Sequence, residues 1–135
     1  KSYDELATFF TLIGGGYLNP IDTGNVNRRQ MKRILEILER DDNIDNIVLL
    51  LTARFATSEQ LETDIPLMIS IRERSPKPVM AIVTHSFAPE EVVQASSIMQ
   101  RLQGGGVPTF VALERGARAL RNALDYYSLK SRVGT

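Results

Sequence analysis

The 135-residue sequence contains no cysteine, a single histidine and no net charge. Without cysteine the chain has no disulfide framework, no thiolate nucleophile and no thiolate metal site, which favours a cytoplasmic protein. Sixteen basic residues balance sixteen acidic ones, so no long-range field attracts nucleic acid or an anionic membrane. No apolar run approaches the roughly 20 residues of a membrane-spanning helix. The amino-terminal residues also lack the apolar segment of a signal peptide.

Sequence motifs of nucleotide binding and of nucleophilic catalysis are absent as well. The chain has neither a GxGxxG fingerprint nor a Walker loop, and its glycine runs at 14–16 and 104–106 instead end predicted helices. His85 has no recognisable nucleophile turn to complete a Ser-His-Asp arrangement. We therefore predict no catalytic residue and no metal site in this chain.

Hydrophobic periodicity predicts alternating helices and strands. Helical spacing of apolar residues predicts helices over 2–13, 26–40, 58–74, from 89 to the glycines at 104–106, and over 115–131. Uninterrupted apolar runs predict strands buried on both faces at 47–51 and 79–84, with a last strand at 107–112, where Pro108 indicates a sheet edge. When the short apolar run at 17–18 is counted as the first strand, the order is a helix followed by four strand–helix units.

Strands that alternate with helices predict an α/β fold. We expect a three-layer, flavodoxin-like or Rossmann-like parallel sheet with helices on both faces. Such domains begin with their central strand, whereas this chain begins with a helix, so we expect the first strand to be missing. Residues 1–135 are then a single domain and a fragment of a larger multidomain protein. The sheet edges left open by a missing strand could lead to a homodimer.

Ligands of such sheets bind beyond the carboxyl ends of the strands. The loops at 22–26, 52–57, 84–88 and 113–115 are therefore the candidate site. A phosphate would bind where the second helix starts, because first-turn amides lack intrahelical partners and the helix dipole attracts an anion. The predicted phosphate-binding residues are Asp22, Thr23, Gly24, Asn25 and Val26. The alternative is that Thr23 or Asn25 is only an N-cap and that Asp22 belongs to an ordinary turn.

Two other residues of these loops are candidate ligand contacts. Arg54 follows the strand at 47–51, where its guanidinium could pair with a phosphate or carboxylate, although it could instead bridge neighbouring domains. His85 lies at the end of the strand at 79–84, where a proton carrier could face a ligand. The alternative for His85 is a loop or helix-entry residue.

Six segments resemble, in order and spacing, the NDP-forming acyl-CoA synthetases. They are Asn19–Gly24, Arg40–Asn46, Ile47–Leu51, Lys77–Ala81, Gly105–Phe110 and Glu114–Leu120. The resemblance extends from Glu5 to Tyr127 and is to the second flavodoxin-like ligase domain, which is related to the carboxy-terminal domain of the succinyl-CoA ligase beta subunit. In that family the glycine-rich loop, here Asp22–Val26, opens one of two helices whose amino ends flank a phosphohistidine.

The resemblance implies a function and a set of partners. The family converts acyl-CoA, NDP and phosphate into free acid, CoA and NTP through an acyl phosphate and a phosphohistidine. The partners would be the other domains of the same synthetase, namely a CoA-binding domain, a histidine-bearing ligase domain and an ATP-grasp domain. CoA, ADP or ATP and magnesium would belong to the full enzyme, and the isolated domain would be inactive. The alternative is a non-catalytic interaction or regulatory domain, as in protein acetyltransferase fusions.

Overall fold

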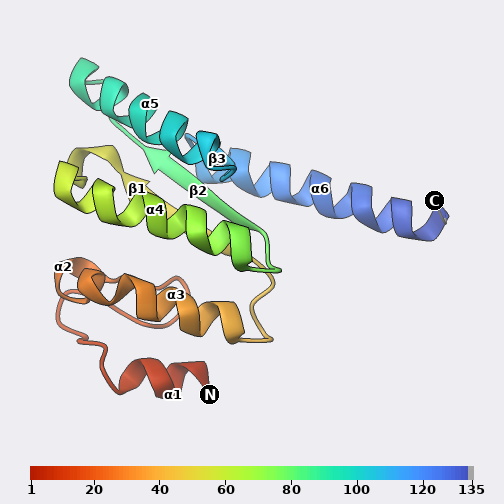
Figure 1. Ribbon diagram of the computed structural model, residues 1–135, viewed down its shortest axis with the longest axis horizontal. Coiled ribbons are helices and arrows are strands. Elements are labelled where there is room, and N and C mark those ends of the chain that lie inside the picture. Colours follow the sequence, from red (N-terminus) through yellow and green to blue (C-terminus); the bar gives the residue numbers. More distant parts are fainter. Residues whose placement is uncertain (134–135) are drawn as a thin grey trace. The chain divides into compact units, whose positions relative to one another are not determined.

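The computed structural model describes residues 1–133, apart from the side chains of Asn25 and Val133. The chain forms an α/β fold with a three-stranded parallel sheet (Figure 1). By internal contacts it divides into two compact units. The first unit contains Lys1–Ile47 and Ser75–Pro78, and the second contains Val48–Arg74 and the chain from Val79 onward.

The helices, the short 3-10 helices η1 and η2, and the strands follow in this order: α1 (Ser2–Ala7), α2 (Gly24–Asn27), η1 (Arg28–Gln30), α3 (Met31–Arg40), β1 (Ile47–Thr52), η2 (Ala53–Phe55), α4 (Ser58–Arg74), β2 (Val79–Thr84), α5 (Pro89–Gly104), β3 (Thr109–Phe110) and α6 (Leu113–Val133). The predicted helix at 58–74, the helix from 89 to the second glycine run and the strand at 79–84 are confirmed. The last helix starts at Leu113 rather than at 115 and continues to Val133.

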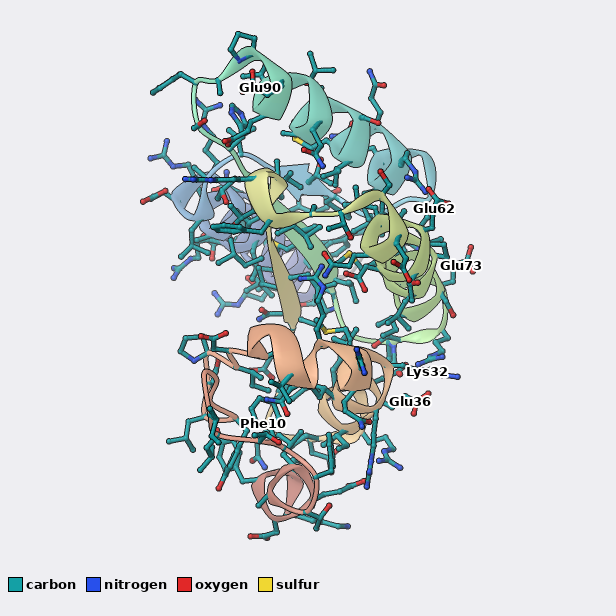
Figure 2. All side chains as sticks on the ribbon, turned by 90° about the vertical axis from the view of Figure 1, so that its left-hand side faces the viewer. Phe10, Lys32, Glu36, Glu62, Glu73 and Glu90 are labelled. Atoms are coloured by element: carbon teal, nitrogen blue, oxygen red, sulfur yellow. The ribbon has the colours of Figure 1, made fainter. Side chains whose placement is uncertain are left out.

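The core of the first unit lies between α1 and α3. Its buried side chains are Leu6, Phe10, Ile34 and Ile37, against which Phe9, Tyr17, Ile21 and Leu38 are partly buried. Figure 2 shows Phe10 inside this unit. The rings of Phe10 and Tyr17 meet edge to face, with centroids 5.8 Å apart. An edge-to-face contact of this kind adds to the stabilisation that burial alone gives these two rings.

Two predicted helices of the first unit are shorter or more broken than the sequence indicated. The helix predicted at 2–13 ends at Ala7, and Leu12 and Ile13 beyond it are exposed. The helix predicted at 26–40 is divided into α2, η1 and α3. One long-range contact affects both places. The backbone of Thr11, beyond the end of α1, is hydrogen-bonded to the side chain of Asn27 in α2, and this contact competes with a regular helix.

The sheet of the second unit has the order β1-β2-β3. Because right-handed crossovers join strands that follow one another in the same direction, α4 and α5 lie on the same face, and they contact each other. Helix α6 lies on the other face (Figures 1 and 2). There Gly116 packs so closely on β2 that a Cβ atom would lie 2.7 Å from Cδ1 of Ile82. The expectation of helices on both faces is confirmed.

The strands differ from the prediction in burial and in number. Residues Val79–Val83 of β2 are all buried, as expected for a central strand, but β1 is buried on one face only. Its Val48 and Leu50 are 40% and 68% exposed. The strand predicted at 107–112 is reduced to Thr109 and Phe110, paired with Ala81 and Ile82 at the sheet edge.

The short apolar run at 17–18 forms no strand of this sheet. The chain around it instead makes a single antiparallel bridge between Gly16 and Asp22. The prediction of four strand–helix units was therefore wrong by one strand. Among residues 1–133, no helix combines the length and the apolar character needed to cross a membrane.

Candidate functional site

The structure brings together two of the four loops that the sequence placed at one site. The loops that follow β1 and β2 start side by side, because the Thr84 hydroxyl lies 3.2 Å from that of Thr52 and 3.3 Å from the carbonyl oxygen of Leu51. The chain at 113–115 is the first turn of α6 in the same unit. The loop at 22–26 belongs to the first unit.

The predicted phosphate loop is a tight turn built from backbone. Gly16 and Asp22 exchange two backbone hydrogen bonds of 2.8 Å each. The amide of Gly24 donates to Oδ1 of Asp22 at 3.0 Å. Gly24 has a φ of +51°, and a Cβ atom there would collide with the carbonyl oxygen of Gly14. Glycine is therefore required here both by the left-handed backbone and by close packing against the chain itself.

The helix start at Gly24 has one amide that is already bonded within the loop. Helix α2 has four residues, and Thr23 before it makes no side-chain capping bond. The first-turn amides of Asn25 and Val26 have no acceptor inside the helix. The Gly24 amide, however, already has the Asp22 carboxylate as its acceptor. An anion at this turn would have to approach a negative charge, and the side chain of Asn25 lies outside the described part of the chain.

Asn27 is a structural residue of this loop that the sequence analysis missed. Its side chain is 2% exposed, and its Nδ2 donates to the carbonyl oxygen of Thr11 at 2.7 Å. In return, its Oδ1 accepts from the amide of Thr11 at 2.8 Å. This two-way bond fixes the backbone of Thr11, which lies before the glycine run, against α2. Nothing in the sequence distinguished Asn27 from the neighbouring Asn25, since the partner is 16 residues away.

At the carboxyl edge of the sheet, the charged residues interact with one another. The Ser86 amide donates to Oε2 of Glu91 at 2.8 Å. This bond lowers the pKa of the Glu91 carboxyl, and the nearby charges of Arg54 and His85 lower it further. Nδ1 of His85 lies 2.6 Å from the carbonyl oxygen of Ser86, so it must carry the hydrogen of that bond. The two predicted ligand contacts, Arg54 and His85, thus share one electrostatic environment around Glu91.

Exposed aromatic rings accompany these charges. Phe55 is 70% exposed and Phe87 is 99% exposed, in the loops that follow β1 and β2. The Arg54 guanidinium carbon lies 5.7 Å from the centroid of the Phe55 ring, within the range of a cation–π contact. This edge therefore carries the Arg54 cation, the half-buried His85 imidazole and two exposed rings beside the Glu91 carboxylate. Such groups can contact an anion or an aromatic ligand.

Two side chains bond to backbone amides at the start of α4. The amide of Gln60 donates to the hydroxyl of Thr57 at 3.3 Å, and the amide of Thr57 donates to Oε1 of Gln60 at 3.2 Å. This reciprocal pair is a capping box for α4. Helix α5 begins with Pro89 and carries Glu90 and Glu91 in its first turn. The start of α4 is thus capped by side chains of the chain itself, whereas Ala88 before α5 makes no side-chain capping bond.

The fold and this edge define the chain as an α/β protein with a parallel sheet whose strand ends carry polar and aromatic residues. No family model, curated protein or solved structure matches the sequence or the fold. Among the described residues, no group of three acidic or histidine side chains is placed to hold a metal ion.

Proposed function

We propose that the chain is a flavodoxin-like ligase domain of a cytoplasmic NDP-forming acyl-CoA synthetase. Such an enzyme converts acyl-CoA, NDP and phosphate into acid, CoA and NTP through a phosphohistidine. This domain would supply the helix start at Asp22–Val26 that stabilises the phosphate. The histidine, the CoA site and the nucleotide site, with its magnesium, would belong to partner domains of the same synthetase.

The observation that carries this proposal is the conformation of Gly24. The resemblance places the phosphate loop at this residue, and Gly24 has the left-handed φ of +51° that a glycine turn at a helix start requires. Helical segments continue from Gly24 to Arg40 before the chain enters β1. The parallel α/β sheet also agrees with the fold that the resemblance implies.

A second candidate is a non-catalytic interaction domain that has kept the synthetase fold. The hydrogen bond between the Gly24 amide and the Asp22 carboxylate favours this candidate. A carboxylate in this position repels phosphate and occupies one of the amides that would bind it. The packing of Gly24 against Gly14 also gives the glycine a purely structural reason to be present.

The Asp22→Asn variant separates the two candidates. Asparagine keeps an oxygen that can accept from the Gly24 amide but removes the negative charge. If the loop binds phosphate, the affinity for inorganic phosphate should rise roughly fivefold, which corresponds to about 1 kcal/mol. Isothermal titration calorimetry of the full chain with phosphate, ADP and CoA measures this change. Asp45→Asn is the matched control, because Asp45 is exposed and lies outside the loop.

Each outcome of the titrations favours one candidate. Phosphate binding that tightens with Asp22→Asn but not with Asp45→Asn supports the phosphate loop. An equal change in both variants would show only an effect of net charge and would contradict it. If none of the three ligands binds the chain or its Asp22→Asn variant, the interaction domain is favoured instead.

A further inference from the structure

A groove of about 520 Å³ lies on the first unit, where η1 and α3 meet α1. A cavity of this size falls within the range of small-molecule sites. The groove shares no residue with the loop at 22–26 or with the carboxyl edge of the sheet. The charged side chains that line it are four cations and two carboxylates, namely Arg29, Lys32, Arg33, Arg40, Glu5 and Glu36.

The positive charge is concentrated at one end of this groove. Arg29, Lys32 and Arg33 lie within five consecutive residues, and no acidic residue occurs between Asp22 and Glu36. Glu36 follows Lys32 by one helical turn on the same side of α3 (Figure 2). Like charges one turn apart repel one another. An anion that neutralises the three cations is therefore stabilised at this end of the groove.

Contacts with α1 and with the chain just after it hold two of the arginines in place. Arg33 stacks on Phe9, with its guanidinium carbon 3.9 Å from the ring centroid. Stacking uses the face of a guanidinium and leaves the N–H groups at its edge for a ligand. At the other end, Nη2 of Arg40 donates to Oε1 of Glu5 at 3.2 Å, and its Nε donates to the carbonyl oxygen of Glu36 at 3.1 Å. Side chains ordered before binding lower the entropy cost of binding a ligand.

We propose that this groove binds a small anion with at least two phosphoryl groups, held by Arg29, Lys32 and Arg33. A guanidinium fork matches a pair of phosphoryl oxygens, and the lysine ammonium adds a point charge. A monovalent anion would leave two of the three cations uncompensated, whereas a diphosphate carries enough charge for all three. The ligand is thus free inorganic diphosphate or the diphosphate of an organic molecule. The proposal does not depend on the proposed function, because the groove and the loop at 22–26 have no residue in common.

Isothermal titration calorimetry of the full chain with inorganic pyrophosphate tests the proposal. Arg29→Gln removes an exposed cation, and we expect it to weaken pyrophosphate binding about tenfold. Arg33→Gln should weaken it to a similar degree. Arg132→Gln is the matched control, because it removes the same charge from an exposed position on α6. The control should leave the affinity within about twofold of that of the unsubstituted chain.

Glu36→Gln tests the electrostatics in the opposite direction. This variant removes a negative charge one turn from Lys32 and Arg33 and keeps the size of the side chain. Pyrophosphate should therefore bind roughly threefold more tightly. Added sodium chloride should weaken binding to the unsubstituted chain, since the three cations are exposed and salt screens them.

Amide chemical shifts in NMR spectra locate the bound anion. Pyrophosphate should perturb the amides of residues 29–36, and Asp22→Asn should leave its affinity there unchanged. Failure of the groove and failure of the phosphate loop at 22–26 are thereby distinguished. ADP that perturbs the same amides at lower concentration than pyrophosphate identifies an organic diphosphate, and weaker binding of ADP identifies the free anion.

Several results would overturn the proposal. They are absence of pyrophosphate binding, an equal loss of affinity in Arg132→Gln, and perturbed amides confined to residues 22–26. Citrate that binds as tightly as pyrophosphate would also contradict it, because charge alone would then explain the binding. Circular dichroism shows whether each variant keeps its fold. Since Arg33→Gln loses the contact with Phe9, Arg29→Gln alone decides if Arg33→Gln unfolds.

Discussion

At the scale of single residues, Gly24 has a backbone conformation that its residue type explains and a packing contact that the sequence could not predict. A glycine between Thr23 and Asn25 can adopt a left-handed backbone at little steric cost, and its φ is +51°. Its close contact with Gly14 depends on how the nine intervening residues fold back, and no local sequence pattern predicts it. The same holds for Asn27, whose partner Thr11 is distant in sequence.

A substitution at Gly24 should therefore destabilise the first unit. Gly24→Ala introduces a Cβ atom into the space next to the Gly14 carbonyl and forces alanine into a left-handed conformation. We expect the free energy of unfolding to fall by about 1–3 kcal/mol. Urea unfolding followed by circular dichroism measures the loss.

The matched control for Gly24→Ala is Gly16→Ala in the same loop. A Cβ atom on Gly16 meets nothing within 4 Å. Its φ also lies outside the left-handed region. Gly16→Ala should change the free energy of unfolding by less than Gly24→Ala does. If the two variants were equally stable, the contact with Gly14 would not be what requires glycine at position 24.

At the scale of helices and strands, the sequence predicted best those elements that depend on their own residues. Helix α4 begins at a capping box, helix α5 begins at a proline and ends at a glycine, and β2 is a continuous apolar run. The region before α3 was predicted poorly because the left-handed Gly14 and Gly24 and the buried Asn27 interrupt the helical pattern. Strand β1 resembled a doubly buried strand in sequence, yet nothing in its composition could reveal which of its faces would be covered.

The carboxyl end of α3 depends on a lysine from another part of the chain. Nζ of Lys77 donates to the carbonyl oxygen of Leu38 at 3.1 Å and also to that of Asp41. A cation at this position adds a second hydrogen bond to each carbonyl, since these oxygens also accept from the Asp41 and Ile44 amides. It also interacts favourably with the helix dipole. Lys77→Met keeps the apolar stem and removes the charge, so stability should fall by about 1–2 kcal/mol in urea unfolding.

Lys32→Met tests whether this loss comes from the capping bonds. Lys32 belongs to α3 as well, and its side chain is exposed. Substituting it removes the same charge without touching the carbonyls at the helix end. A similar loss in both variants would indicate that net charge, and not the cap, stabilises α3.

At the scale of the whole chain, the alternation of helices and strands was sufficient to predict an α/β fold with a parallel sheet. The expectation that residues 1–135 form a single domain stays a prediction, while by its contacts the chain clusters into two compact units. The chain passes between these units near Ile47 and again on each side of Ser75–Pro78. Composition does not change at these points, so the sequence carries no signal of the division.

The pH dependence of stability should have a contribution from each unit. In the first unit, a hydrogen bond from the Ser2 side chain and another from the Asn43 amide lower the pKa of Asp41 below its ordinary 3.8. In the second unit, the Ser86 amide lowers the pKa of Glu91 below its ordinary 4.5. Because each folded pKa lies below the unfolded value, this stability is fully present above pH 4.5 and is lost as the pH falls through 3.8 and below.

Substitutions that remove these two ionisable groups should reduce the loss of unfolding free energy at low pH. Asp41→Asn and Glu91→Gln keep an oxygen that can accept the backbone hydrogen bond but cannot ionise. Urea unfolding at a series of pH values should show a smaller loss of stability below pH 4.5 in each variant than in the unsubstituted chain. Asp42→Asn removes an exposed carboxylate from the same turn as Asp41 and serves as the control. Two results would show that these carboxylates do not determine stability at low pH. One is an unchanged loss of stability in the Asp41 and Glu91 variants, and the other is an equal reduction of that loss by Asp42→Asn.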